Sequence, residues 1–359
     1  MRLNNSVGNN CKAVALSTVM NHYGYPFSEA VCFGLSGAFD FSFSKVKFKN
    51  SYFDCVTGNN DNDYYSFAKL MDMKLRIVKS QNSKDLKKLL KDNIQSGVPV
   101  ISRVSIDKYI DILAQRYFRI GETYTKETQK IFNMLQTSAG IHVVVVGDIG
   151  DELIQIYEQN IEKPVNLTWK CFANAANPKT TCIMHPVNTV YIFENNYSYD
   201  QIKDHMDLIS AKAIYENMSN YLFTNSRWYG HARIEEVRDW IVDTLKKEGN
   251  HKELEMFPFF CDTIAGGGFY RRIYSHFLSE INEMYFNSSY FTDEAKSYMK
   301  LSRKWSSVAK MIKTVNMNTE RTEKDIDSLV SEIDKIIGIE YDLANKLLEK
   351  GEAYLNGNK

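Results

Sequence analysis

The spacing of hydrophobic residues changes at about residue 195, and this change constrains the fold more than any other feature. Before it, segments with three- and four-residue spacing alternate with segments of two-residue spacing, which indicates mixed helices and strands. After it, helical spacing dominates. The chain has 359 residues, about twice the usual length of a domain. We therefore predict an α+β domain over residues 1–195 and a helical domain over residues 196–359.

Local signals place individual elements within this division. Apolar residues from Cys11 to His22 follow helical spacing, and Ser28 is a typical cap for a second helix that ends at Leu35. The last segment, 325–348, has the apolar stripe of a packing helix. Further helices are expected at 64–72 and 83–95, and strands at 39–53, 74–78, 98–104 and 188–193.

The clearest hairpin follows in the middle of the chain. An aliphatic strand begins at Ile141, residues 148–152 form a turn, and an alternating return strand ends at Glu158. An antiparallel hairpin of this length brings His142 and Glu158 to neighbouring strand ends.

Cys11 is the candidate nucleophile. The unpaired N–H groups and the dipole at a helix start favour a thiolate there. His142 follows in the order expected of a base brought to a helix-borne thiol. Glu158 is the candidate that orients the imidazole, and Asn160 is the runner-up. Each residue alone also fits a structural role, since most cysteines are small buried hydrophobes. The prediction therefore depends on the ordered set.

Asn5 is the candidate oxyanion donor. It precedes Cys11 by six residues, the offset at which papain-like enzymes carry a glutamine that donates to the oxyanion. Its amide and the backbone N–H of Cys11 would together stabilise a tetrahedral intermediate. No cysteine or histidine spacing indicates a metal site, so we expect no metal.

Two separated motifs resemble the butirosin biosynthesis acyltransferase family. Residues 10–24, followed by Ser28-Glu-Ala-Val-Cys-Phe-Gly-Leu35, are similar to its amino-terminal domain, with a cysteine and a short helix ending in Tyr-Gly. The usual residue before that cysteine is His, and here it is Asn10. Residues 259–278 are similar to the glycine-triplet, arginine and Phe-Leu signature of the helical domain that follows in these proteins, and Trp305 also falls where they carry a tryptophan.

The resemblance implies a papain-like cysteine acyltransferase/protease fold with a helical C-terminal domain. Such proteins are similar in taking an acyl or peptidyl chain from a carrier-protein thioester and passing it to an amine. The amide-forming enzymes of closthioamide-type peptide assembly are a narrower match. The resemblance thus implies a Cys11 acyl-enzyme, a carrier protein and a small amine (a diamine is one candidate) as partners, and no bound cofactor, because the substrate arrives on phosphopantetheine. Glu158 stands where relatives more often place Asp or Asn.

Two stretches are candidates for substrate contacts. Gly266, Gly267, Gly268 and Arg271 would cradle the pantetheine phosphate through backbone N–H groups and a guanidinium. The alternative is a tight loop that lets a helix pack closely. The basic stretch from Lys74 to Lys91 is a candidate docking face for an acidic carrier protein, with an ordinary solvated helix as the alternative.

Charge and hydropathy argue against three classes of protein: nucleic-acid binders, secreted proteins and membrane proteins. The 44 basic residues balance 44 acidic ones, which disfavours a nucleic-acid partner. The amino terminus lacks the apolar core of a signal peptide, and the longest aliphatic run, Val143 to Val146, is far below the roughly 20 residues of a membrane helix. We expect a cytoplasmic protein without membrane contact.

Two alternatives stay open at this stage. A thioesterase or cysteine peptidase would use the same three residues and would differ mainly in the access of water. A non-catalytic scaffold that binds a carrier protein would not depend on Cys11 at all. The helical domain is open between a lid over the site and a dimer interface.

Overall fold

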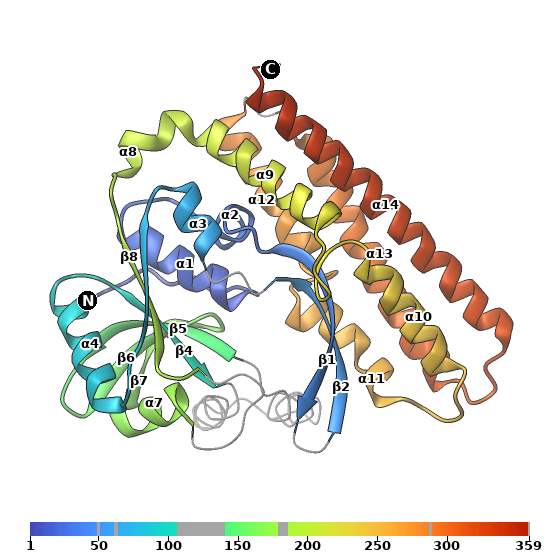
Figure 1. Ribbon diagram of the computed structural model, residues 1–359, viewed down its shortest axis with the longest axis horizontal. Helices are drawn as coiled ribbons and strands as arrows, with labels where there is room; N and C mark the ends of the chain where they lie inside the picture. The colour runs from blue at the N-terminus through green and yellow to red at the C-terminus, as the bar shows by residue number, and fades with distance from the viewer. Residues whose placement is uncertain (49–50, 61–63, 106–140, 179–185, 287–288, 358–359) are drawn as a thin grey trace. The chain divides into compact units, whose positions relative to one another are not determined.

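The computed structural model describes residues 1–48, 51–60, 64–105, 141–178, 186–286 and 289–357 (Figure 1). The chain forms two compact units. The first unit comprises Met1–Pro26, Lys47–Tyr52 and Met73–Asn196, and the second comprises Phe27–Val46, Phe53–Asp72 and Tyr197–Lys359. The main boundary thus lies one residue after the division predicted from the sequence. The structure differs in that the two segments between residues 27 and 72 belong with the carboxy-terminal helices.

A six-stranded sheet forms the centre of the first unit. Its strand order is β3-β8-β4-β5-β6-β7, and each neighbouring pair is antiparallel. β5 lies inside the sheet and is buried on both faces, which explains its continuous valine run. The strands are β3 (Lys74–Lys79), β4 (Val100–Ser105), β5 (Ile141–Ile149), β6 (Leu153–Glu158), β7 (Ile161–Thr168) and β8 (Thr189–Glu194).

Helices cover both faces of this sheet. α4 (Ser83–Gln95) and α7 (Trp169–Ala176) pack on one face against alternate strand residues such as Val144 and Val146. α1 (Cys11–His22) packs against β4, β5 and β6, and its residues lie outside that cluster, so it covers the opposite face. The predicted helix over these residues and the predicted hairpin, in which Val145 pairs with Tyr157, are both confirmed.

The second unit is largely helical, as predicted. Its longest helix, α14, packs along α9 and α13 and contains the predicted terminal helix. β1 (Phe39–Phe48) and β2 (Ser51–Asn59) form a separate two-stranded sheet. The α-helices are α2 (Glu29–Leu35), α3 (Tyr65–Leu70), α8 (Tyr199–Ile202), α9 (Met206–Phe223), α10 (Arg233–Leu245), α11 (Lys252–Glu255), α12 (Arg271–Tyr285), α13 (Thr292–Met317) and α14 (Glu323–Leu355), with a 3₁₀ helix η1 (Lys203–His205) and a π-helix η2 (Phe259–Ile264).

The α+β class and the helical carboxy-terminal region therefore agree with the prediction. No helix within the described ranges combines the length and the apolar character needed to cross a bilayer.

Candidate active site

The fold brings Cys11 and His142 together. α1 begins at Cys11, where Asn10 caps the helix by accepting a hydrogen bond from the N–H of Ala13 at 3.0 Å. His142 is the second residue of β5, the strand against which α1 packs. The thiol and the imidazole are hydrogen-bonded, and the backbone of Val143 hydrogen-bonds the same sulfur.

The two groups stabilise each other's charged form. Burial raises the pKa of the Cys11 thiol, but the charge and hydrogen bond of His142 outweigh it, so the pKa falls below the ordinary value of 9.0. Burial alone would lower the pKa of His142, yet Cys11 and then Glu158 raise it to about 10. The contact therefore favours the thiolate and imidazolium over the neutral thiol and imidazole.

Glu158 holds the imidazole from its other side. The Nε2 atom of His142 donates to Oε1 of Glu158 at 2.8 Å, and the two side chains are only 9% and 0% exposed. Because Nε2 is engaged by the carboxylate, Nδ1 is the ring nitrogen left for the thiol. The predicted hairpin accounts for this contact, since Glu158 ends β6 beside β5.

Asn160 in turn holds the carboxylate of Glu158. The backbone N–H of Asn160 donates to Oε2 at 2.8 Å, and its side-chain amide donates to Oε1 at 3.2 Å. The two residues that the sequence offered as alternatives thus act in series: Glu158 contacts the imidazole, and Asn160 fixes Glu158.

Asn5 has a different position from the one its predicted oxyanion role requires. Its side-chain amide nitrogen donates to the carbonyl oxygens of Glu158 and Ile161, both at 2.9 Å. Its Oδ1 accepts a hydrogen bond from the hydroxyl of Thr18 at 3.1 Å. Both amide protons are therefore taken, and we correct the oxyanion prediction. Asn5 instead ties α1, through Thr18, to the turn that carries Glu158, and we call this arrangement the Asn5 brace.

Neighbouring residues reinforce the brace. The N–H of Gly8 donates to the carbonyl of Gln159 at 2.9 Å, and the N–H of Leu3 donates to the hydroxyl of Tyr157 at 3.0 Å. Residues 3–8 thus run along the end of β6. Sequence reasoning missed this contact, and the only signal was the asparagine-rich run before Cys11.

The glycine triplet and Arg271 form packing contacts rather than an open phosphate site. Arg271 is 0% exposed, and its Nε donates to Oε1 of Glu340 at 2.7 Å. A Cβ on Gly268 would lie 2.5 Å from the backbone of Ser302 in α13. The loop of Gly266, Gly267 and Gly268 therefore permits close helix packing, the alternative that the sequence left open.

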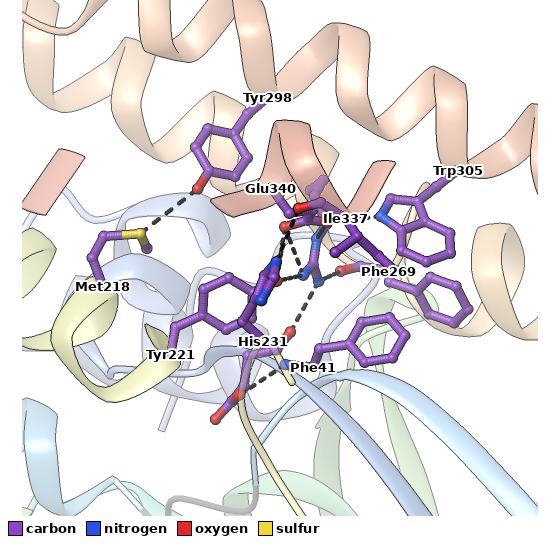
Figure 2. Close-up of polar contacts among 11 residues, drawn as sticks. Phe41, Met218, Tyr221, His231, Phe269, Tyr298, Trp305, Ile337 and Glu340 are labelled. Atoms are coloured by element: carbon purple, nitrogen blue, oxygen red, sulfur yellow. Dashed lines mark hydrogen bonds and ion pairs between the residues drawn. The ribbon is translucent and has the colours of Figure 1, made fainter. Parts of the chain in front are cut away.

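Glu340 organises the cluster around this arginine (Figure 2). Its Oε1 also accepts from the indole N–H of Trp305 at 2.7 Å, and its Oε2 accepts from the hydroxyl of Tyr221 at 2.9 Å. The guanidinium of Arg271 is thus fully engaged inside the second unit and cannot reach a pantetheine phosphate. We correct that prediction, including the three glycines.

The basic stretch 74–91 has much of its charge balanced within the first unit. Lys74 and Arg76 pair with Glu194 at 3.0 and 2.6 Å, and Lys91 lies 3.9 Å from Asp151. This balance weakens the case for a docking face here, which stays a prediction.

Cys11 differs from the other thiols of the described residues. Cys32 and Cys261 are buried, and burial raises the pKa of both thiols well above the ordinary value. No disulfide joins any of the five cysteines in this part of the chain. No group of three or more potential ligands among the described residues is arranged to hold a metal ion.

Two protein families match the chain. The family described as "Butirosin biosynthesis protein H, N-terminal" matches residues 10–113, and "Domain of unknown function (DUF4872)" matches residues 181–347. The first range includes Cys11, whereas His142 and Glu158 lie between the two ranges, so their assignment rests on geometry. None of the curated proteins compared with the chain matches it. The chain therefore contains an amino-terminal domain of the butirosin biosynthesis protein H type, followed by a DUF4872 domain.

Proposed function

We propose that the protein is a cysteine-dependent acyltransferase that forms an amide bond in natural-product biosynthesis. The observation that carries this proposal is the hydrogen-bonded chain from Cys11 through His142 to Glu158, which favours a reactive thiolate. A helix-borne cysteine packed on an antiparallel sheet that carries the histidine also supports a papain-like fold. The family match to a biosynthesis protein supports a biosynthetic role.

The first half-reaction loads the enzyme. The Cys11 thiolate attacks the carbonyl carbon of a carrier-protein thioester, and the bond from that carbon to the pantetheine sulfur breaks. The imidazolium of His142 gives its proton to the leaving sulfur, so a thiol departs. One thioester replaces another of similar energy. The backbone N–H of Cys11, at the start of α1, is the proposed oxyanion donor.

The second half-reaction makes the amide. An amine attacks the acyl group on Cys11, now-neutral His142 takes the proton from the nitrogen, and the bond to the Cys11 sulfur breaks. This restores the thiolate and the imidazolium. Glu158 and Asn160 keep the ring oriented through both steps, because the carboxylate is held from both residues.

The partners follow from this chemistry. The donor is an acyl or peptidyl chain on the phosphopantetheine of a carrier protein, and the acceptor is a small amine. No resident cofactor takes part, because the thioester already supplies the activated carbonyl.

Partition between amine and water tests the proposal. Wild-type protein is incubated with an acetyl-pantetheine thioester, with and without the diamine putrescine, and the products are measured by mass spectrometry. We expect acetylated diamine from wild type and none from His142→Ala. Release of acetate at the same rate with and without putrescine would instead assign a thioesterase. No product of either kind would leave the scaffold alternative.

A further inference from the structure

The solvent-exposed face of α13 has a one-sided charge. From residue 296 to its end at residue 317, the helix contains six basic residues and no acidic residue, although the chain as a whole is neutral. All six are exposed. They are Lys296, Lys300, Arg303, Lys304, Lys310 and Lys313.

Part of this charge forms a single stripe. Lys296, Lys300, Arg303 and Lys310 follow one another at helical spacings of four, three and seven residues, so they lie on one side of the helix. At 1.5 Å per residue the stripe is about 21 Å long.

The first half of the stripe borders a groove between α12 and α13, which we call the α12–α13 groove. Its volume is about 370 Å³. α12 contributes His276 and two serines to its lining, and α13 contributes three cations and two apolar side chains. The lining residues that matter here are His276, Ala295, Lys296, Met299, Lys300 and Arg303.

The cations of the α12–α13 groove lack counter-charges within the described residues, where no carboxylate pairs with Lys296, Lys300 or Arg303. Elsewhere in the same unit cations do contact a carboxylate, since Lys346 and Lys350 both pair with Glu294. Like charges held together without counter-ions repel each other, so an acidic partner would relieve the repulsion.

We propose that the α12–α13 groove docks an acidic helix of the carrier protein, an inference that rests on the proposed function. Carrier proteins are small and acidic, and a helix laid into a groove is a common recognition mode. Met299 supplies an adaptable apolar contact, and the flanking cations steer the encounter. A nucleic acid fits less well, because such binders commonly carry a basic excess, whereas the 44 basic residues of this chain are matched by 44 acidic ones.

Matched charge reversals test the proposal. The groove variant carries Lys296→Glu, Lys300→Glu and Arg303→Glu. The control variant carries Lys212→Glu, Lys246→Glu and Lys247→Glu, which makes the same charge change at exposed residues of the second unit outside the groove. Both are built on Cys11→Ala, so binding is measured without acyl transfer.

The probe is a fluorescein-labelled holo acyl carrier protein of bacterial fatty-acid synthesis, and binding is followed by anisotropy at low and high salt. We expect the groove variant to weaken binding by about tenfold to a hundredfold and to lose most of the salt dependence. The control variant should change Kd by less than about threefold. Absent binding by the parent protein, unchanged binding by the groove variant, or an equal loss in the control variant would overturn the proposal. Equally effective competition by polyuridylate RNA would overturn it too, since the groove would then bind any polyanion.

Failure of this inference is distinguishable from failure of the proposed function. Acetyl-pantetheine lacks the carrier protein, so its reaction with wild type reports on Cys11 chemistry alone. Carrier binding at the groove without any acylation of Cys11 would sink the enzyme proposal and leave the docking surface standing. Acylation by acetyl-pantetheine without groove-dependent carrier binding would do the reverse.

Discussion

Replacing Glu158 by Gln removes the buried negative charge that faces His142 while it nearly preserves the shape of the side chain. The carboxylate accepts from Nε2 of His142 and from the backbone N–H of Asn160, both at 2.8 Å. A glutamine has one acceptor oxygen, so its NH₂ group must face one of these donors. The imidazolium therefore loses a charged acceptor, and the Cys11 thiolate loses part of the positive charge that lowers its pKa.

The size of the effect follows from the hydrogen bond. A bond to a charged group contributes about 1.5–3 kcal/mol, and one pKa unit corresponds to about 1.4 kcal/mol. Because Cys11 and His142 titrate as a coupled pair, we expect the pH midpoint for thiolate formation to rise by about one to two units in Glu158→Gln.

The assay is the pH dependence of alkylation by iodoacetamide, which reacts with the thiolate. Glu162→Gln is the matched control, since Glu162 is exposed on the neighbouring strand β7. We expect its midpoint to equal that of wild type. A Glu158→Gln midpoint that stays at the wild-type pH would refute the role of Glu158 in stabilising the ion pair.

Three further predictions follow from the geometry. Because the pKa of His142 is raised to about 10, the imidazolium persists up to that pH, so the acyl-transfer rate should fall only as the pH rises to about 10. A rate that already falls as the pH rises through 6.5, the ordinary pKa of histidine, would contradict this. Asn5→Ala should lower the acylation rate by about tenfold and raise the thiolate midpoint, whereas exposed Asn4→Ala should do neither; a loss of thermal stability alone would reduce Asn5 to a structural role. Arg271→Ala should cost about 3–5 kcal/mol in urea unfolding, against less than about 1 for Arg272→Ala; equal values would contradict a buried ion pair at Glu340.

The parts of the site that local signals specify were predictable. Helical spacing gave the helix that begins at Cys11, and the aliphatic run with its turn gave the hairpin of β5 and β6. These two elements alone bring His142 and Glu158 together near the thiol. The general position of the candidate triad therefore depends on short-range patterns that a single sequence contains.

The elements that escaped prediction have weak or ambiguous local signals. β7 contains Pro164, which argues against a strand, but β7 is the edge of the sheet, where a missing N–H is tolerated. α7 follows directly and was missed as well, although Thr168 is a good cap and accepts from the N–H of Cys171.

Long-range partners could not be read from the sequence at all. Asn5 finds its acceptors more than 150 residues away, so its six-residue offset from Cys11 suggested an oxyanion role that the hydrogen bonds do not support. Arg271 finds Glu340 at a separation of 69 residues, so a motif that looked like a phosphate cradle is a packing cluster. The same limit explains why nothing in the sequence indicated that the segments 27–46 and 53–72 cluster with the carboxy-terminal helices.

Intact-protein mass spectrometry tests the central claim most directly. Wild type, Cys11→Ala and Cys171→Ala are each incubated with acetyl-pantetheine and with acyl-loaded carrier protein, then quenched in acid. Cys171 is the matched control because its thiol is exposed. We predict a single acyl adduct on wild type and on Cys171→Ala, none on Cys11→Ala, and discharge of the adduct by added diamine. An adduct that persists on Cys11→Ala, or none on any of the three proteins, would contradict the assignment of Cys11 as the nucleophile.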